Sequence, residues 1–406
     1  MQLSWLVVLF SVVAGVDNVC LVYTGDGELD GFVSEPCNQR HLVRRDEEGD
    51  VVQGVGSKVR WVLECDLERY GGLCGKIKNA LVLMAGFLEN VFAIKHLNIK
   101  ATFMSFCEKK KVCNTGNLGL STSSRFIRVS EDNVNIFYPQ PLFNHKFPTQ
   151  AKNQQPFDMY VDLNSDADFY FPDDYFKEQQ STQPAFMDTL VHEVNHGLGF
   201  LSSLKCRIPR VVIPLYSTIT RITTNASGIT STKQLLFAFN AFDKHILVSD
   251  ANKTIFEYAK EVNRLGPLDV VGETSTAELL TTCPHRKVFD EITRFADTPQ
   301  NFVFQTSNNI SVPLETRILS RGFAPSHMDN ETYVNSKDST MRAKRNQGTG
   351  IHNMFNKTQK WITSPYGPDI QAVFTTLGYS LNPEPKYENS MEYHYFLHHL
   401  KPQTST

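Results

Sequence analysis

The residues best suited to chemistry form one short segment, His192-Glu193-Val194-Asn195-His196. Residues four apart lie on one face of an α-helix, so the two imidazoles can bind a single metal ion. Imidazole nitrogen is a preferred ligand of zinc. Glu193 follows the first histidine and projects beside such an ion, where its carboxylate can take a proton from a zinc-activated water. The segment therefore predicts a zinc site that has its own general base.

A helix that ends directly after this motif is expected to position it. Pro184 is favoured in a first turn, with Thr182 or Gln183 just before it. Gly197 and Gly199 can end the helix close to the metal. The apolar residues that would pack the helix are Leu190, Val191, Val194 and Leu198. This packing face argues against the alternative of a surface helix with two unrelated histidines.

The longer segment His192–Phe200, with the sequence HEVNHGLGF, resembles the signature of the metzincin clan of zinc peptidases. Typical metzincins place a third His or Asp ten residues after the first histidine, and that position is Ser202 here. The segment is more similar to leishmanolysin-like members and to secreted microbial proteins in which a long insertion precedes the third ligand. The resemblance implies an α+β, zincin-like catalytic domain with a twisted mixed sheet, an active-site helix and a methionine turn.

In those secreted proteins a Ser-His-x-Asp segment, a methionine and a terminal helix follow in that order. This chain contains Ser326-His327-Met328-Asp329, then Asp338-Ser339-Thr340-Met341, then Tyr366-Gly367-Pro368 leading to Gly378-Tyr379. The resemblance implies that His327 is the third ligand of one catalytic Zn²⁺ and that Met341 is the methionine of the turn beneath it. His285 and His352 are competing imidazoles, and Glu278 would be the ligand in a zincin of another type.

Polar residues near the proposed third ligand have two interpretations. Asp329 and Asp338 can orient a histidine ligand, and capping a turn is an equally good account of each. Asn330 belongs to an Asn-x-Ser/Thr sequon three residues after His327. A glycan on Asn330 would have to point away from the zinc site.

The N-terminus and the cysteines indicate export. Residues 1–15 form a short apolar run that ends in small residues, as in a cleaved signal peptide. Eight cysteines follow it, an even count that fits four disulfides in an oxidising compartment. Proximity favours the pairs Cys107–Cys113 and Cys206–Cys283. The potential glycosylation sites are Asn225, Asn252, Asn309, Asn330 and Asn356.

The pattern of residues divides the chain into segments. Residues 16–75 form a cysteine-containing N-terminal region; a cut near Arg44-Arg45 would make it a propeptide, although a solvated basic pair is the simpler account. From Lys76 apolar residues recur at spacings of three and four, which predicts an amphipathic helix, and residues 99–103 and 159–163 alternate as strands. We expect residues 76–205 to form an upper catalytic subdomain that contains the zinc helix, and residues 206–320 to form an insertion or lower subdomain. Residues 321–380 should contain the third ligand, the methionine turn and the C-terminal helix. Residues 381–406 are expected to form a tail.

Composition excludes some classes of partner. Of the 406 residues 41% are hydrophobic, and 40 Lys plus Arg against 43 Asp plus Glu leave a net charge of −3. Such a chain can bury a large core, and its balance suggests no nucleic-acid partner. No second apolar stretch of about 18 residues follows the first, so no stable membrane anchor is expected. The expected partner is a protein or peptide substrate.

These observations predict a secreted, extracellular zinc metallopeptidase that hydrolyses peptide bonds with Glu193 as general base and with His192, His196 and His327 as metal ligands. The alternative is a secreted, non-catalytic zinc-binding or host-interaction protein on the same fold. A carboxylate beside the metal favours the enzyme, because a purely structural site has no need of one.

Overall fold

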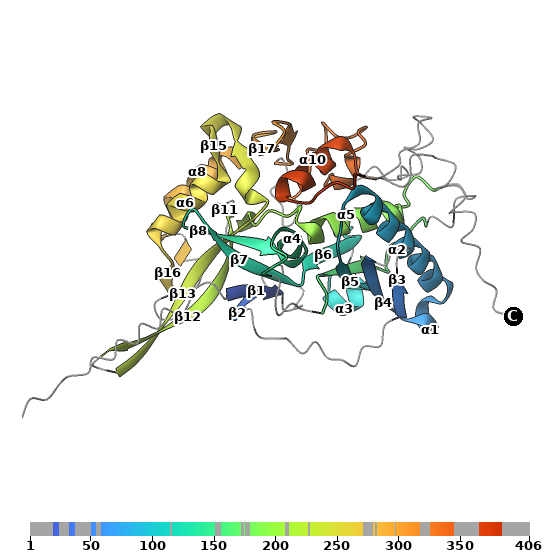
Figure 1. Cartoon of the computed structure of the whole chain (residues 1–406), viewed down its shortest axis with the longest axis horizontal. Coiled ribbons are helices and arrows are strands. Elements are labelled where there is room, and N and C mark those ends of the chain that lie inside the picture. The colour runs from blue at the N-terminus through green and yellow to red at the C-terminus, as the bar shows by residue number, and fades with distance from the viewer. Residues whose placement is uncertain are drawn as a thin grey trace, which may run out of the picture.

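The computed structural model describes residues 19–23, 32–36, 50–53, 58–113, 116–150, 156–171, 174, 179–207, 211–225, 228–270, 279–280, 282–296, 298–316, 325–344 and 365–383. These residues form an α+β structure with twisted, mixed sheets (Figure 1). The coarse fold class predicted from the sequence is therefore confirmed. The proposed signal peptide and residues 384–406 of the proposed tail lie outside the described residues.

A five-stranded sheet underlies the histidine motif. Its strands run in the order β3 (Asp50–Gln53), β4 (Val59–Cys65), β5 (Leu97–Met104), β9 (Met159–Asn164) and β6 (Gly119–Ser123). The strands β4, β5 and β9 are parallel, and the outer strands β3 and β6 are antiparallel to their neighbours. Alternate residues of β9 are buried, because one face of the sheet packs on the core. The strand order places β6 at one edge of the sheet, next to β9.

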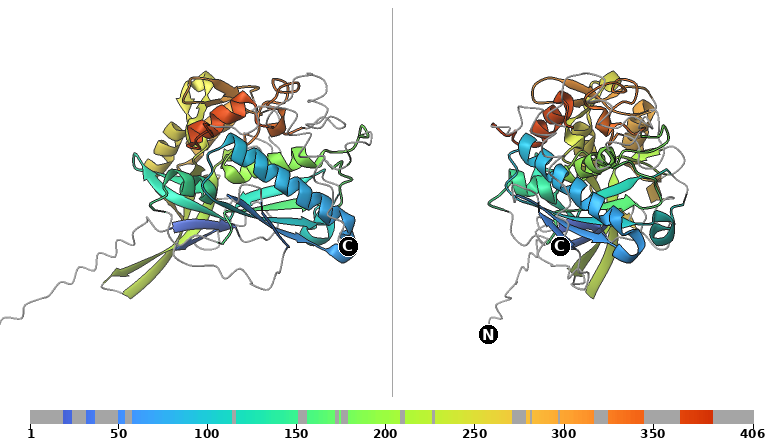
Figure 2. Two further views of the ribbon diagram at one scale, coloured as in Figure 1. Left: turned by 45° about the vertical axis from the view of Figure 1, so that its right-hand side comes forward. Right: turned by 90° about the vertical axis from the view of Figure 1, so that its right-hand side faces the viewer.

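Two helices pack on the buried face of this sheet, α2 (Gly72–Val91) and α5 (Phe186–Leu198). The apolar stripe predicted for the first helix is buried, with Ile77, Leu81 and Leu88 fully covered. Figure 2 shows α2 in blue lying over the sheet, with the green α5 beside it and the red α10 (Pro368–Leu377) above. The hydroxyl of Tyr379, just after α10, donates to the carbonyl of Leu198 at 2.9 Å. The C-terminal helix is thereby bonded to the end of α5.

After β6 the chain enters a second sheet, which has seven strands. Its strands run in the order β12 (Leu215–Asn225), β13 (Gly228–Asn240), β8 (Val134–Pro139), β7 (Arg125–Glu131), β1 (Val19–Tyr23) and β2 (Phe32–Pro36), and β16 (Leu268–Val270) also pairs with β13. The long β12–β13 hairpin extends away from the body of the molecule (Figure 1). Because β13 pairs in parallel with β8, the segment predicted as an insertion is part of this sheet.

Smaller elements complete the described fold. A four-stranded sheet has the order β15 (Lys253–Thr254), β14 (Ile246–Val248), β17 (Phe302–Gln305) and β18 (Ser311–Pro313), and β10 (Lys205–Arg207) pairs with β11 (Val211–Ile213). The other helices are α1 (Leu67–Tyr70), α3 (Phe106–Lys110), α4 (Gln140–Lys146), α6 (Ile255–Leu265) and α8 (Arg286–Ala296), with the 3₁₀ turns η3 (Asp243–His245), η4 (Ser249–Ala251) and η5 (Ser339–Met341).

The start of α5 differs from the prediction. The helix begins at Phe186 and not at Pro184, because Ala185 forms a parallel bridge with Tyr170 and is held extended. The Phe186 amide donates to the Tyr170 carbonyl at 2.9 Å. The predicted end is correct in part. Gly199 has a φ of 119° and forms the left-handed C-cap, whereas Gly197 is still inside the helix.

One of the two predicted disulfides is present and the other is not. Cys107–Cys113 is confirmed, and a second disulfide joins Cys65 to Cys74 and so connects β4 to α2. The predicted Cys206–Cys283 pair is wrong, because Cys283 is a buried free thiol whose Sγ lies 3.7 Å from the carbonyl of Leu280 in its own turn. None of the helices in the described residues is long and apolar enough to span a membrane.

Candidate metal centre

Helix α5 presents the first two histidines of the motif. His192 and His196 lie one turn apart, with their ring centroids 4.6 Å from each other. The helix is almost entirely buried between the sheet, α2 and the C-terminal segments. Only 7% of His192 and 9% of His196 is exposed. These side chains are therefore held in a fixed, largely water-excluded position.

The structure brings His327 to this pair from a distant part of the chain. The Nε2 atoms of His192 and His196 are 3.1 Å apart, and those of His192 and His327 are 3.2 Å apart. One ligand atom from each of the three histidines falls within 4.8 Å of the others. Among the described residues, this is the cluster with the geometry to hold a metal ion.

Backbone carbonyls determine which nitrogen of the α5 histidines faces the centre. Nδ1 of His192 lies 2.7 Å from the carbonyl oxygen of Thr340, and Nδ1 of His196 lies 2.8 Å from that of Phe200. A carbonyl only accepts, so each Nδ1 carries the proton and donates it. In the neutral rings, both Nε2 lone pairs therefore point to the centre.

Hydrogen bonds of the main chain hold His327 in place. Its carbonyl accepts from the Glu315 amide at 2.8 Å. The following residue, Met328, donates its amide to the carbonyl of Met341 at 2.8 Å and forms a parallel bridge with Arg342. These bonds place His327 beside the turn η5 (Ser339–Met341), which contains Met341.

Met341 is fully buried in η5, which contacts α5. The preceding residue, Thr340, provides the carbonyl that orients His192. This turn therefore acts on the site through its backbone. Sequence reasoning missed the carbonyls of Thr340 and Phe200, because every residue carries a carbonyl and side-chain identity gives no signal of its direction.

The competing third ligands do not lie at this centre in the described part of the chain. His285 is buried elsewhere, with Nε2 2.9 Å from the carbonyl of Gly266 and its ring against Phe237. Glu278 and His352 lie outside the described residues. His327 is thus the described residue that completes the cluster.

Ser202 occupies the position at which typical metzincins carry a third ligand, and it has another role here. Its hydroxyl donates to the buried carboxylate of Asp243 at 2.5 Å, and its amide donates to the Ser326 hydroxyl at 3.0 Å. Burial raises the pKa of Asp243, while hydrogen bonds from Ser202 and Ser203 oppose the shift. This network connects the loop after α5 to the residue preceding His327.

The two aspartates with open roles both cap turns. Asp329 accepts from the amide and the hydroxyl of Thr332 at 2.8 and 2.7 Å. Asp338 accepts from the Ile370 amide at 2.9 Å and so caps the N-terminus of α10. Burial raises the pKa of Asp338 to about 6. Asp329 thus caps a turn of its own segment, whereas Asp338 holds the start of a helix 32 residues further along the chain.

Asn330 is bonded inward. Its Nδ2 donates to the carboxylate of Glu315 at 2.6 Å, and its Oδ1 accepts from the Lys344 amide at 2.9 Å. Glu315 is fully buried. A sugar would replace one of the two hydrogens on Nδ2 and would have to fit beside the buried Glu315 side chain, which disfavours it.

We expect glycans on Asn252 and Asn309 and none on Asn330 when the protein passes through a eukaryotic secretory pathway. Both expected sites are exposed, with φ of 46° and 60° in turns, whereas Asn330 is bonded to Glu315. Peptide mass spectrometry after enzymatic deglycosylation in ¹⁸O-water would measure occupancy at each asparagine. A glycan on most Asn330 peptides would contradict the inward orientation of this side chain.

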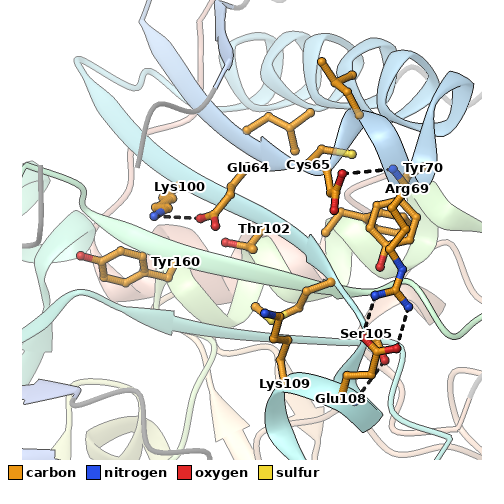
Figure 3. A pocket seen from close by; sticks show the side chains of 15 residues that line it. Glu64, Cys65, Arg69, Tyr70, Lys100, Thr102, Ser105, Glu108, Lys109 and Tyr160 are labelled. Carbon is orange, nitrogen blue, oxygen red and sulfur yellow. Dashed lines mark hydrogen bonds and ion pairs between the residues drawn. The ribbon is translucent and has the colours of Figure 1, made fainter. Parts of the chain in front are cut away.

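A separate hollow lies on the opposite face of the five-stranded sheet and has a volume of about 650 Å³. Lys100, Thr102 and Tyr160 project into it (Figure 3). Two ion pairs lie in it, Arg69 with Glu108 at 2.6 Å and Lys100 with Glu64 at 3.0 Å (Figure 3). These pairings give no indication of a ligand, so the histidine cluster is the candidate site.

A family model and one curated protein each match most of the chain. A family model described as SPBPB7E8-like matches residues 47–398. A Schizosaccharomyces pombe protein, named only as uncharacterised protein PB7E8.01, is 24% identical over 323 residues, which cover 70% of this chain and 55% of that protein. The chain thus spans about half the length of this curated relative. No solved structure matches the chain.

Proposed function

The chain belongs to the SPBPB7E8-like family, and we propose that it is a secreted, zinc-dependent endopeptidase with a zincin-like, metzincin-related catalytic domain. His192, His196 and His327 would hold the ion, and Glu193 would be the general base. A protein or peptide is the proposed substrate.

One observation carries this proposal, the convergence of imidazole lone pairs. With Nδ1 protonated on His192 and His196, neither Nε2 can donate to the other across the 3.1 Å that separates them. Two lone pairs facing each other in a buried site repel, and burial in low dielectric makes this repulsion stronger. A cation between the nitrogens would remove the repulsion. The arrangement therefore supports a metal site over a hydrogen-bonded pair.

The spacing and the donor set both fit zinc. Tetrahedral ligands about 2.0–2.1 Å from zinc are about 3.3 Å from one another. The measured Nε2 separations of 3.1 and 3.2 Å are close to this value. Three neutral imidazoles leave one coordination position for water or substrate, which is typical of catalytic sites and not of structural ones.

Held by these three histidines, zinc would supply Lewis acidity, which lowers the pKa of a bound water toward 7 and polarises a peptide carbonyl. Glu193 follows a proposed ligand directly and is 6% exposed, so its carboxylate would lie beside the ion and is shielded from bulk water. We propose that Glu193 accepts the proton of the attacking water and then delivers it to the nitrogen of the leaving amine. During this step the carbonyl of Thr340 keeps His192 oriented, and the carbonyl of Phe200 keeps His196 oriented.

The surrounding fold supports a zincin-like domain. Helix α5 contacts β6, the antiparallel edge strand of the mixed sheet, and η5 with Met341 contacts the same helix. The left-handed Gly199 turns the chain so that the Phe200 carbonyl reaches His196. These features match the elements that the resemblance implies around the metal.

Export is part of the same proposal. The apolar N-terminal segment resembles a signal peptide, and the disulfides Cys65–Cys74 and Cys107–Cys113 are consistent with an oxidising compartment. The extracellular space is therefore the proposed location.

We expect the purified mature protein to contain one zinc ion per chain and to lose thermal stability when a chelator removes it. Binding of the ion to the folded state only is coupled to folding, so apo protein should unfold at a lower temperature, and added zinc should restore the parent value. Elemental analysis and differential scanning calorimetry would measure both. Metal-free protein whose unfolding temperature does not respond to zinc would contradict the assignment of the site.

A further inference from the structure

Helix α5 lies directly over the edge strand β6, and Gly119 lies at their contact. A Cβ atom on Gly119 would lie 2.7 Å from Cγ of Glu193 and 3.1 Å from both Cδ and Oε1. Real Cβ atoms essentially never approach another heavy atom closer than 3.0 Å. The Glu193 side chain therefore occupies the space that any other residue at position 119 would fill.

The backbones on both sides of this contact are held in place. Gly119 pairs with Leu163 in the antiparallel β6–β9 ladder. Glu193 lies in the middle of α5, and the same helix packs closely further along, where a Cβ on Gly197 would lie 2.9 Å from Oγ of Ser121. Neither main chain can move away without breaking the packing between helix and sheet.

A clash at Cγ affects the whole side chain of Glu193. Rotation of the carboxylate alone cannot relieve it, because Cγ is moved only by rotation about the bonds nearer the backbone. A new rotamer would carry the carboxylate to another position. In a buried site, a displacement of about 1 Å can lower the rate of a reaction by about a hundredfold.

We propose that Gly119 is a positioning residue for Glu193, and that its missing side chain lets the carboxylate lie against the edge strand beside the metal. This inference rests on the proposed peptidase function. It assigns a role to a glycine 74 residues before Glu193. The close approach, and not an unusual backbone conformation, requires the glycine, because its φ is outside the left-handed region.

The test is the Gly119→Ala variant with its metal bound, assayed on a quenched-fluorescence peptide library. We expect kcat to fall by at least about tenfold with zinc content unchanged and with a smaller change in KM, because the base is displaced while the ligands are intact. Gly86→Ala is the matched control: a Cβ at Gly86 of α2 meets no atom within 4 Å. This control should keep the parent kcat and zinc content.

Two double variants separate positioning from a general disturbance of the fold. In a Glu193→Gln background, Gly119→Ala should cause no further loss of the residual rate, because the displaced group is no longer a base. Gly119→Ala alone should lower the unfolding temperature through the clash with Glu193. In a Glu193→Ala background the same substitution should leave the unfolding temperature unchanged, because the clashing atoms are absent. Additive losses in both backgrounds would overturn the inference.

The outcomes distinguish this inference from the proposed function. An active parent together with a Gly119→Ala variant of parental kcat would overturn the positioning role and leave the peptidase proposal intact. A zinc-loaded parent that cleaves no peptide would overturn the peptidase proposal, whereas the unfolding experiments would still report whether Gly119 and Glu193 are coupled.

Discussion

The Glu193→Gln variant is expected to retain its zinc and to lose at least about a hundredfold in the rate of peptide hydrolysis. Glutamine has nearly the same shape but cannot accept the proton of the attacking water, and about a hundredfold is the usual scale for loss of a general base. The ligands should be undisturbed, since the Thr340 carbonyl orients His192 and the Phe200 carbonyl orients His196.

Zinc content by elemental analysis and kcat on a peptide library would be measured on the same samples. Glu261→Gln is a matched control, because this residue lies on α6, pairs with Lys253 at 2.7 Å and is remote from the histidines in sequence. It should retain both zinc and activity. Parental activity in Glu193→Gln would refute the peptidase proposal, and a secreted zinc protein without turnover would become the better account.

The His327→Ala variant is expected to lose both zinc and activity, in contrast to Glu193→Gln. Two imidazoles without the third bind the ion much more weakly. Where free zinc is about 100 times the dissociation constant of the parent, binding stabilises the parent by about 2.7 kcal/mol, and the variant would forgo most of this. Its unfolding temperature in zinc should therefore approach that of the apo parent.

His285→Ala is the corresponding control for a buried histidine outside the cluster. Its ring bonds to the Gly266 carbonyl, so the substitution can lower stability, yet zinc should remain bound at one ion per chain. Titration of each variant with zinc, followed by calorimetry, separates the two effects. Full zinc and activity in His327→Ala, with loss of both in His352→Ala or Glu278→Ala, would show that the third ligand is misassigned while the enzyme class stands.

The sequence by itself determined the features that depend on residues close together in the chain, such as the faces of helices and strands and the end of a helix. The spacing of His192 and His196 places both on one helical face in any α-helix, so two facing imidazoles with a carboxylate beside them could be predicted without the fold. The apolar stripe of α2 and the alternation in β9 depend only on the geometry of a helix and a strand. The left-handed Gly199 likewise follows from the freedom of glycine at a helix end.

Only the tertiary structure could decide contacts between residues far apart in the chain. His327 is 135 residues from His192, and only the resemblance to a family, not any rule of spacing, favoured it over His285 before the structure was known. The orienting carbonyl of Thr340, 148 residues from His192, is chemically the same as every other carbonyl. The free Cys283 and the closeness of Gly119 to Glu193 also depend on how strands and helices pack. Spacing along a chain sets local geometry, whereas the approach of distant backbones is determined by the packing of the whole core.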